Sequence, residues 1–475
     1  MFIGRDKYLE TLDKLYIRPR SDLIVVFGRR RIGKSFLCQR HLKRHLGLSF
    51  EGVEAQSSSF QIKSIIGKLK IILSEYLRGN EIRYTWEGVL DLFTIYLREI
   101  EPKKKKIIFL DEYQRLASGR STLTSLIKRY WDNEWKDLSV QLILCGSVSS
   151  FMVKKVIKSK ALYGRIDSQL NIEALFPDSA AKFFKKDVSS IEILKYLVVF
   201  GGVPKYLIDL DLTSSFEQNL ANIFFNKDSS YVNEYEKIFY SQFKEHQVYE
   251  RIVDALSLAP LTLGEISSKL SIPSGGGLKS YLVNLENAKF ISGYLLSPEN
   301  MKGKIISYKI VDPFLRFYLY FVRPNMKLIQ SSSSPKLAFN SITKGRLNTY
   351  LGLAFENYCN LNAMYIANHL GFEEEVVSWG PIISRKSEVF QADLVYFRST
   401  KIITLCELKF SDSEIAPSII SEIEPRIDKL RKKFPNYSIQ KALITTIGQS
   451  KTLKASGYFD HSLIGRELLA SSSTN

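Results

Sequence analysis

Cysteine is scarce in this sequence of 475 residues: there are only Cys38, Cys145, Cys359 and Cys406, far apart along the chain. No two of them form a Cys-x-x-Cys pair, so the spacing typical of zinc ribbons and redox motifs is absent. Disulfide scaffolds are short and rich in cysteine, which also argues against that class. The sequence therefore predicts free thiols and a reducing compartment.

Long apolar runs are also missing. No stretch approaches the roughly 18 apolar residues that a membrane helix needs, and the opening residues MFIGRDKYLE lack the apolar segment of a signal peptide. We therefore expect a cytoplasmic protein with no membrane partner.

Acidic residues are outnumbered, with 49 Asp and Glu against 67 Lys and Arg, which gives a net charge of +18. A basic surface attracts polyanions, so nucleic acid is the expected partner, with DNA favoured and RNA left open. The alternative is a basic surface that serves solubility alone. Hydrophobic residues make up 45% of the chain, as in folded globular proteins.

The length suggests roughly three domains, and the pattern of the sequence changes along the chain accordingly. Short β-branched runs alternate with helical patterns up to about residue 180, which predicts an α/β fold with a parallel sheet. Helical periodicity follows, then a serine-rich stretch, then a second mixed pattern. The expected segments are an α/β core at 1–180, a helical lid at 181–244, a third domain at 245–325, a linker at 326–340 and a C-terminal domain at 341–475.

A phosphate-binding motif of the form GxxxxGKS runs from Gly28 to Ser35, between an apolar strand and an amphipathic helix. Its glycines let the backbone wrap around phosphates, Lys34 reaches the β and γ phosphates, and Ser35 is a ligand for Mg²⁺. For the three arginines in the loop, contacts with phosphate, with DNA or with the protein's own acids all remain open. The expected ATP-binding residues are Gly28, Arg29, Arg30, Arg31, Ile32, Gly33, Lys34, Ser35 and Phe36.

A second motif, IIFLDEYQRL, ends an apolar strand with Asp111 and Glu112. This order is typical of a Walker B element. Asp111 would bind Mg²⁺, and Glu112 would polarise the water that attacks the γ-phosphate.

Two further residues are candidates for sensing the γ-phosphate. Ser147 ends the strand-like run LILCGS, where it either contacts the nucleotide or merely caps a helix. Arg165, in LYGRIDSQL, either reaches a nucleotide in its own or a neighbouring subunit or is an ordinary surface arginine. The neighbouring-subunit alternative would require a homo-oligomer.

The motifs FIGRDKYLETL, GRRRIGKS, FLDEYQRL, CGS, YGR and GGVPKYL occur in this order. Together they resemble the archaeal-type ATPase family, in the STAND-like branch (MNS clade) of P-loop ATPases, over roughly residues 1–325. The resemblance implies an ASCE/AAA-like P-loop NTPase fold, an N-terminal segment with Gly4 and Arg5 near the adenine, a helical lid and a winged-helix domain.

Residues 245–312 have the order expected of a winged helix: helix, helix, glycine-rich turn, helix, then a hairpin-like pair. The third helix carries Lys279 and Asn284 but also the apolar stripe Leu282, Leu285 and Ala288. Either it reads DNA, or it serves as a packing module between domains.

The C-terminal domain places charges on a strand that otherwise looks buried, LCELKFS, which contains Glu407 and Lys409. The simpler interpretation is an edge strand whose solvent-exposed face carries Glu407 and Lys409 as a pair of opposite charges. With Asp393 on the preceding strand and Glu356 on a helix, they form a D-(x)n-ExK pattern. Carboxylates at these positions would bind Mg²⁺ or Mn²⁺, and Lys409 would position the attacking water.

This domain resembles the PD-(D/E)xK nuclease superfamily in those four residues and in its expected order α-β-β-α-β. Ala392 stands where that family often has proline. The resemblance implies an ATP-regulated, metal-dependent nuclease that acts on DNA, with defence against foreign DNA as a setting. The alternative is a nucleotide-gated switch that binds DNA or a partner and whose C-terminal domain does not cut.

Overall fold

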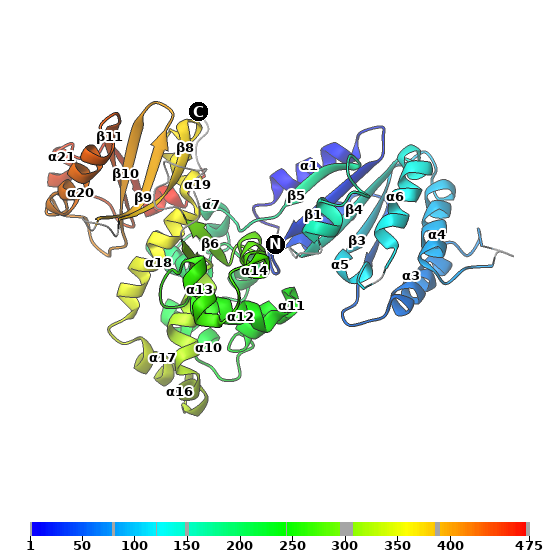
Figure 1. Cartoon of the computed structure of the whole chain (residues 1–475), viewed down its shortest axis with the longest axis horizontal. Coiled ribbons are helices and arrows are strands. Elements are labelled where there is room, and N and C mark those ends of the chain that lie inside the picture. Colours follow the sequence, from blue (N-terminus) through cyan, green and yellow to red (C-terminus); the bar gives the residue numbers. More distant parts are fainter. Residues whose placement is uncertain are drawn as a thin grey trace. The chain divides into compact units, whose positions relative to one another are not determined.

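The computed structural model describes residues 2–77, 81–119, 121–147, 152–243, 245–294, 307–384 and 390–471 (Figure 1). The chain forms two compact units, Met1–Glu173 and Ala174–Asn475. Within the described ranges, no helix combines the length and the apolar character that crossing a bilayer requires.

The first unit is built on five parallel strands in the order β2-β3-β4-β1-β5. The central strands are apolar and almost wholly buried, as expected for a sheet covered by helices on both faces. The prediction of an α/β fold with a parallel sheet is therefore confirmed. The strands are β1 (Asp22–Gly28), β2 (Gly47–Glu51), β3 (Lys106–Asp111), β4 (Val140–Ser147) and β5 (Ile166–Asn171).

Helices connect these parallel strands. α4 shows how the sequence specifies one of them: Thr85 caps its first turn by accepting from Gly88 N, and its apolar face joins the core under the sheet. The main helices of this unit are α1 (Asp6–Tyr16), α2 (Lys34–Leu42), α3 (Ser58–Ile72), α4 (Trp86–Glu99) and α6 (Leu123–Asn133). Since the strands are parallel, the carboxyl ends of β1, β3 and β4 meet at one edge of the sheet.

The second unit begins with the helices α7 to α11. It continues with the helices α12, α13 and α14 and with the antiparallel strand pair β6 and β7. This is the order expected for residues 245–312, although 295–306 lie outside the described residues. The elements are α7 (Pro177–Ala181), α8 (Ser190–Phe200), α9 (Pro204–Ile208), α10 (Phe216–Phe224), α11 (Glu234–Gln242), α12 (His246–Ala255), α13 (Leu263–Leu270), α14 (Gly276–Asn287), β6 (Ile291–Tyr294), β7 (Ser307–Ile310) and α15 (Pro313–Phe317).

The segment expected to be a linker, 326–340, is largely helical. It contains α16 (Met326–Ser331) and the start of α17 (Pro335–Thr343). Ser334 caps α17 by accepting from Leu337 N, and Pro335 occupies its first turn. Ile329 and Phe339 are buried, so this part of the chain is a packed connection, and the serine-rich run is only the turn between two helices.

The C-terminal part of the second unit contains a five-stranded mixed sheet in the order β12-β11-β10-β9-β8. α18 (Leu347–Leu361) packs on β9 and β10, and α20 (Ile419–Lys433) packs on β9 and β11. The expected order omits β8, because Gly380 and Pro381 interrupt its strand pattern, and it also omits β12. The strands are β8 (Val376–Ser384), β9 (Phe390–Arg398), β10 (Ile402–Lys409), β11 (Ser438–Thr445) and β12 (His461–Ile464).

Candidate functional site

The phosphate-binding motif forms the loop between β1 and α2, and its two glycines have separate roles. A Cβ on Gly28 would lie 2.3 Å from the carbonyl oxygen of Ile172, so no side chain fits there. Gly33 has a φ of 91°, a left-handed conformation that glycine adopts without strain. The backbone geometry therefore requires the glycines that the motif supplies.

Lys34 begins α2 and is only 6% exposed. Its Nζ donates to the carbonyl oxygen of Arg29, 2.8 Å away, so it lies over its own loop. Burial lowers the pKa of Lys34, while the charges of Glu112 and Asp111 oppose that change. A buried ammonium group inside a turn of backbone amides offers a positive charge and N–H donors, which are the groups that bind the oxygens of a polyphosphate.

Asp111 and Glu112 lie at the carboxyl end of β3, at the same edge of the sheet as the loop. Asp111 Oδ1 accepts from Glu112 N at 2.9 Å, and Glu112 has a φ of 46°, unusual for a side chain of this size. Glu112 Oε2 accepts from Gln114 Nε2 at 2.6 Å. Strained backbone of this kind persists where the surroundings hold it, often at functional sites. Gln114 was not among the sequence predictions, and no motif position marks it.

Ser147 ends β4, in register with Gly28 on the neighbouring strand. It is 3% exposed, and among the described residues its Oγ has no hydrogen-bond partner. A buried hydroxyl without a partner is costly, and this one lies at the edge that carries the phosphate-binding loop. Its position at this edge is compatible with a contact to a nucleotide, while residues 148–151, which a cap would involve, lie outside the described residues.

The remaining residues of the loop differ in exposure. Arg29 is buried, whereas Arg30 lies 3.9 Å from Glu54, one of the protein's own acids. Phe36 is 53% exposed, with its ring 5.9 Å from that of Phe2. Arg31 has a φ of 65°, Ile32 is buried, and Ser35 is the second residue of α2.

The N-terminal segment is attached to the loop by Arg5. Its guanidinium donates to the carbonyl oxygen of Ile32 at 3.0 Å and to that of Glu173 at 2.8 Å. Burial lowers the pKa of Arg5 to about 10. This arrangement favours a role for Arg5 in supporting the loop, with Gly4 providing the turn before it.

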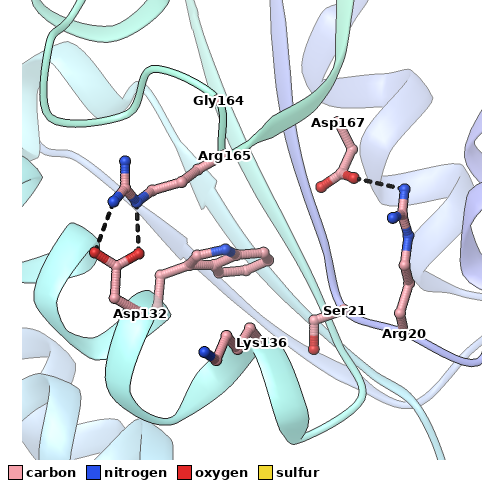
Figure 2. A pocket seen from close by; sticks show the side chains of 8 residues that line it. Arg20, Ser21, Asp132, Lys136, Gly164, Arg165 and Asp167 are labelled. Carbon is pink, nitrogen blue, oxygen red and sulfur yellow. Dashed lines mark hydrogen bonds and ion pairs between the residues drawn. The ribbon is translucent and has the colours of Figure 1, made fainter.

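Arg165 lies at the opposite end of the sheet. It precedes β5, whose first residue, Ile166, pairs with Leu23 at the start of β1. Its guanidinium is paired with Asp132 (Figure 2), and the two nitrogen–oxygen distances are 2.5 and 2.8 Å. Both residues line a pocket of about 430 Å³. The hydrogen bonds that Arg165 donates to Asp132 raise the pKa of Arg165. Arg165 therefore does not reach the phosphate-binding loop of its own chain, which leaves two alternatives: a nucleotide in a neighbouring subunit, or an ordinary surface arginine paired with Asp132.

In the second unit, Glu356 and Asp393 line a cavity of about 140 Å³, which we call the acidic cavity. Burial, followed by the charges of Asp393 and Glu407, raises the pKa of Glu356 to about 7, and the charges of Arg316 and Lys309 offset only part of that rise. Two carboxyl groups brought together in a partly buried space are the oxygen ligands that Mg²⁺ and Mn²⁺ prefer. Glu356 and Asp393 are therefore the residues of the acidic cavity that could hold a hard divalent cation.

Two cations of the acidic cavity were missed by sequence reasoning. Lys309, on β7, and Arg316, on α15, line it together with Gln391. Burial, with Arg316 nearby, lowers the pKa of Lys309 to about 8. No local motif marks either residue, because both come from elements far away in the sequence.

Glu407 and Lys409 have other partners. Because they are two residues apart on β10, they share one face of the sheet, and α20 covers that face. Arg426 of α20 lies 2.8 Å from Glu407, and Glu422 of α20 lies 3.1 Å from Lys409. The two strand residues are also 3.2 Å apart. The structure therefore explains these charges by a partly buried ion-pair network, of which Glu407 is the buried member. Glu407 also lies near enough to Glu356 to raise its pKa.

The helix expected to read DNA is α14. Lys279 is exposed on it, but Asn284 is buried and donates to the hydroxyl of Tyr249 at 2.7 Å. Leu282, Leu285 and Ala288 are buried as expected. Of the two polar residues, Lys279 alone remains available to a nucleic acid.

Residues 2–210 match a protein family described as an ATPase domain predominantly from Archaea, so the chain carries an archaeal-type ATPase domain. An uncharacterised protein of Methanocaldococcus jannaschii is 29% identical over 359 residues, which cover 75% of this chain and 76% of that protein. A second uncharacterised protein of the same organism is 33% identical over 82 residues, 17% of this chain and 79% of its own. A Walker-type ATPase of Pyrococcus abyssi is similar in structure, with a TM-score of 0.49 and 18% identity, over 67% of this chain and 96% of that one.

Proposed function

We propose that this archaeal-type ATPase domain binds and hydrolyses ATP with Mg²⁺, and that nucleotide state regulates a metal-dependent nuclease site in the C-terminal domain. One observation carries the first part: Lys34, Asp111, Glu112 and Ser147 all lie at the edge of the sheet where the carboxyl ends of β1, β3 and β4 meet. The second part rests on the acidic cavity.

At the nucleotide site, the Nζ of Lys34 would leave the carbonyl oxygen of Arg29 and bind phosphate oxygens. Asp111 and Ser35 would hold Mg²⁺, which neutralises phosphate charge when bound. The carboxylate of Glu112 would orient the attacking water and accept its proton, with Gln114 holding that carboxylate in place. Ser147 would donate its free hydroxyl to the γ-phosphate.

At the acidic cavity, Glu356 and Asp393 would hold Mg²⁺ or Mn²⁺, which when bound would activate water and stabilise the dianionic transition state of phosphodiester hydrolysis. The raised pKa of Glu356 supports this role, because crowded carboxylates gain the most from a cation. Glu407 and Lys409 would join the site only by exchanging their ion pairs with α20. Lys309 and Arg316 would bind the phosphate of the nucleic acid.

The proposed substrate is DNA, with RNA as the alternative polyanion. The net charge of +18 supports it, and Lys279 is an exposed cation on the helix of the proposed winged-helix domain. A homo-oligomer would give Arg165 a nucleotide in a neighbouring subunit. Defence against foreign DNA is a setting in which an ATP-regulated nuclease would act.

A second candidate is a nucleotide-gated switch whose C-terminal domain binds without cutting. The observation that favours it is the engagement of Glu407 and Lys409 with α20, which gives both charges a purely structural role. In this case the carboxylates of Glu356 and Asp393 would be neutralised by Lys309 and Arg316, and the acidic cavity would have only a structural role within the second unit.

The deciding experiment measures cleavage of plasmid DNA and ATP turnover on the same preparations, with Mg²⁺ or Mn²⁺ and with or without ATP. We expect Asp393→Asn to abolish cleavage and to leave ATP turnover intact. Asp412→Asn, which changes an exposed carboxylate in the same domain, serves as the matched control. Cleavage by Asp393→Asn at the wild-type rate would eliminate the nuclease, and nucleotide-dependent DNA binding without cleavage would establish the switch.

A further inference from the structure

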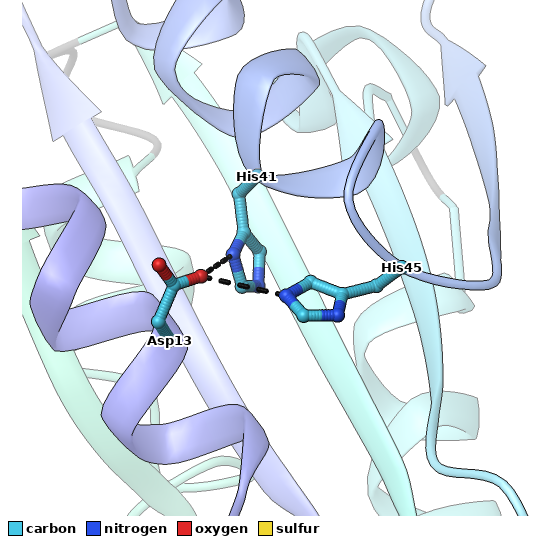
Figure 3. Close-up of side chains that lie close together, drawn as sticks. All are labelled: Asp13, His41 and His45. Atoms are coloured by element: carbon cyan, nitrogen blue, oxygen red, sulfur yellow. Dashed lines mark hydrogen bonds and ion pairs between the residues drawn. The ribbon is translucent and has the colours of Figure 1, made fainter.

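Two histidines and an aspartate lie together in the first unit, away from the nucleotide site. Asp13 is on α1, His41 is in the last turn of α2, and His45 follows that helix. Figure 3 shows both rings converging on the same carboxylate. His41 Nδ1 lies 2.8 Å from Asp13 Oδ1, and His45 Nε2 lies 3.4 Å from the same oxygen. We call these three residues the Asp-His-His cluster.

The cluster is held from several sides. The side chain of His41 is fully buried, while those of His45 and Asp13 are 21% and 33% exposed, so the cluster is open to solvent on one side. Tyr16 stacks on the ring of His45 with centroids 3.8 Å apart. Arg44 donates to Asp13 Oδ2 at 3.0 Å, which orients the carboxylate and leaves Oδ1 to the histidines.

A hydrogen-bond chain determines which nitrogen of His41 carries a proton. Gln141 Nε2 donates to the carbonyl oxygen of Leu12 at 3.1 Å, so the amide oxygen of Gln141 must face the other way. That oxygen is 2.6 Å from His41 Nε2, which must therefore be the donor. Turning the amide over would set its oxygen against the carbonyl of Leu12. The proton of a neutral His41 is thus on Nε2, and Nδ1 carries a lone pair.

This tautomer places the lone pair of Nδ1 against the carboxylate of Asp13, which has only acceptor oxygens. In a neutral ring these two acceptors face each other at 2.8 Å, and all three ligand atoms of the cluster lie within 4.8 Å of one another. A cation shared between them would turn this repulsion into attraction.

We propose that Asp13 Oδ1, His41 Nδ1 and His45 Nε2 bind a divalent transition-metal ion of the Zn²⁺ class. Imidazole nitrogens with one carboxylate oxygen are ligands that this class takes, at about 2.0–2.2 Å in tetrahedral geometry. Such bonds separate the ligand atoms by about 3.3 Å. The distance from His45 to Asp13 already matches, and the distance from His41 to Asp13 must widen by about half an ångström.

Gln141 supports this site in the way that outer-shell partners support metal-bound histidines, because it holds the N–H of the ligand ring and directs the other nitrogen at the ion. The ion would join α1 to the carboxyl-terminal end of α2, the helix whose first residue is Lys34. The site is thus a structural link at the far end of the phosphate-binding helix, and it is independent of the proposed nuclease.

The test uses the full-length protein, freed of metal with a chelator and without nucleotide, titrated with Co²⁺ followed by absorption in the visible range. Octahedral oxygen sites such as the acidic cavity absorb weakly, so the visible band reports a tetrahedral site with nitrogen ligands. We expect one equivalent of Co²⁺ to bind and Zn²⁺ to displace it. His45→Gln and Asp13→Asn should each weaken binding at least tenfold.

His246→Ala is the matched control, because His246 also faces a carboxylate, that of Glu250 at 3.0 Å, but lies outside the cluster. Circular dichroism confirms that each variant is folded, and glutamine and asparagine in the two cluster variants keep the polarity and approximate size of the residues that they replace. Wild-type affinity in both cluster variants would overturn the proposal. So would a wild-type protein that takes up no stoichiometric Co²⁺ or Zn²⁺, since a shared proton would then hold Asp13 and His41 together.

Discussion

Replacing Glu356 with glutamine should stabilise the metal-free protein above pH 7. Burial first, and then the charges of Asp393 and Glu407, raise the pKa of Glu356 to about 7 from its ordinary value of 4.5. Below pH 4.5 the carboxyl group is protonated in the folded and unfolded chains alike. As the pH rises from 4.5 to 7, the unfolded chain loses this proton first, so the folded state loses stability through that window. Glutamine carries no such charge and avoids the loss.

The size of the effect follows from the two pKa values. Their difference of about 2.5 corresponds to about 3.4 kcal/mol, at 1.36 kcal/mol for each pKa unit. Glu356 is partly open to solvent, which screens its interactions, so about 1–2 kcal/mol is the expected gain for Glu356→Gln at pH 8. The gain should largely vanish at pH 5, where the carboxyl group is protonated in the folded protein.

Urea unfolding of wild type and Glu356→Gln at pH 5 and pH 8 measures this directly, through the difference between their midpoints. Glu374→Gln is the control, since Glu374 is an exposed glutamate of the same domain. Mn²⁺ should reverse the order at pH 8 by stabilising wild type more than the variant. An equal effect of Glu356→Gln at both pH values would refute the proposed charge crowding, and an unchanged order with Mn²⁺ would remove Glu356 from the metal site.

Two further predictions concern the nucleotide site and the nucleic acid. Lys34→Ala should weaken MgATP binding by about 2–4 kcal/mol, roughly 30- to 1000-fold, measured by calorimetry. Glu112→Gln should bind ATP normally and slow ATP turnover by about 10²- to 10⁴-fold. Normal turnover in Glu112→Gln would show that Glu112 does not activate the attacking water. The log affinity for duplex DNA should fall with log salt by about 0.9 for each phosphate contacted, and Lys279→Ala should reduce that slope by about one contact. An affinity that does not change with salt would contradict DNA binding through phosphates.

The sequence by itself was sufficient for the first unit's architecture and for the position of its phosphate-binding loop. Both depend on local signals: buried β-branched runs predict a parallel sheet, and the loop needs glycines where Gly28 and Gly33 stand. The position of Asp111 and Glu112 at the end of a strand is likewise predicted by a local signal, the apolar run that precedes them. Such features follow from backbone conformation and from periodicity over a few residues, which a single sequence displays.

Only the tertiary structure decided which charges meet. Glu407 and Lys409 pair with α20, and Arg165 pairs with Asp132, because the packing of helices on a sheet determines which side chains face each other. Lys309 enters the acidic cavity from a strand that the sequence does not connect with Glu356. The Asp-His-His cluster likewise depends on the packing of α1 against α2. Contacts of this kind join residues far apart in sequence, and no local pattern specifies the geometry that brings them within bonding distance.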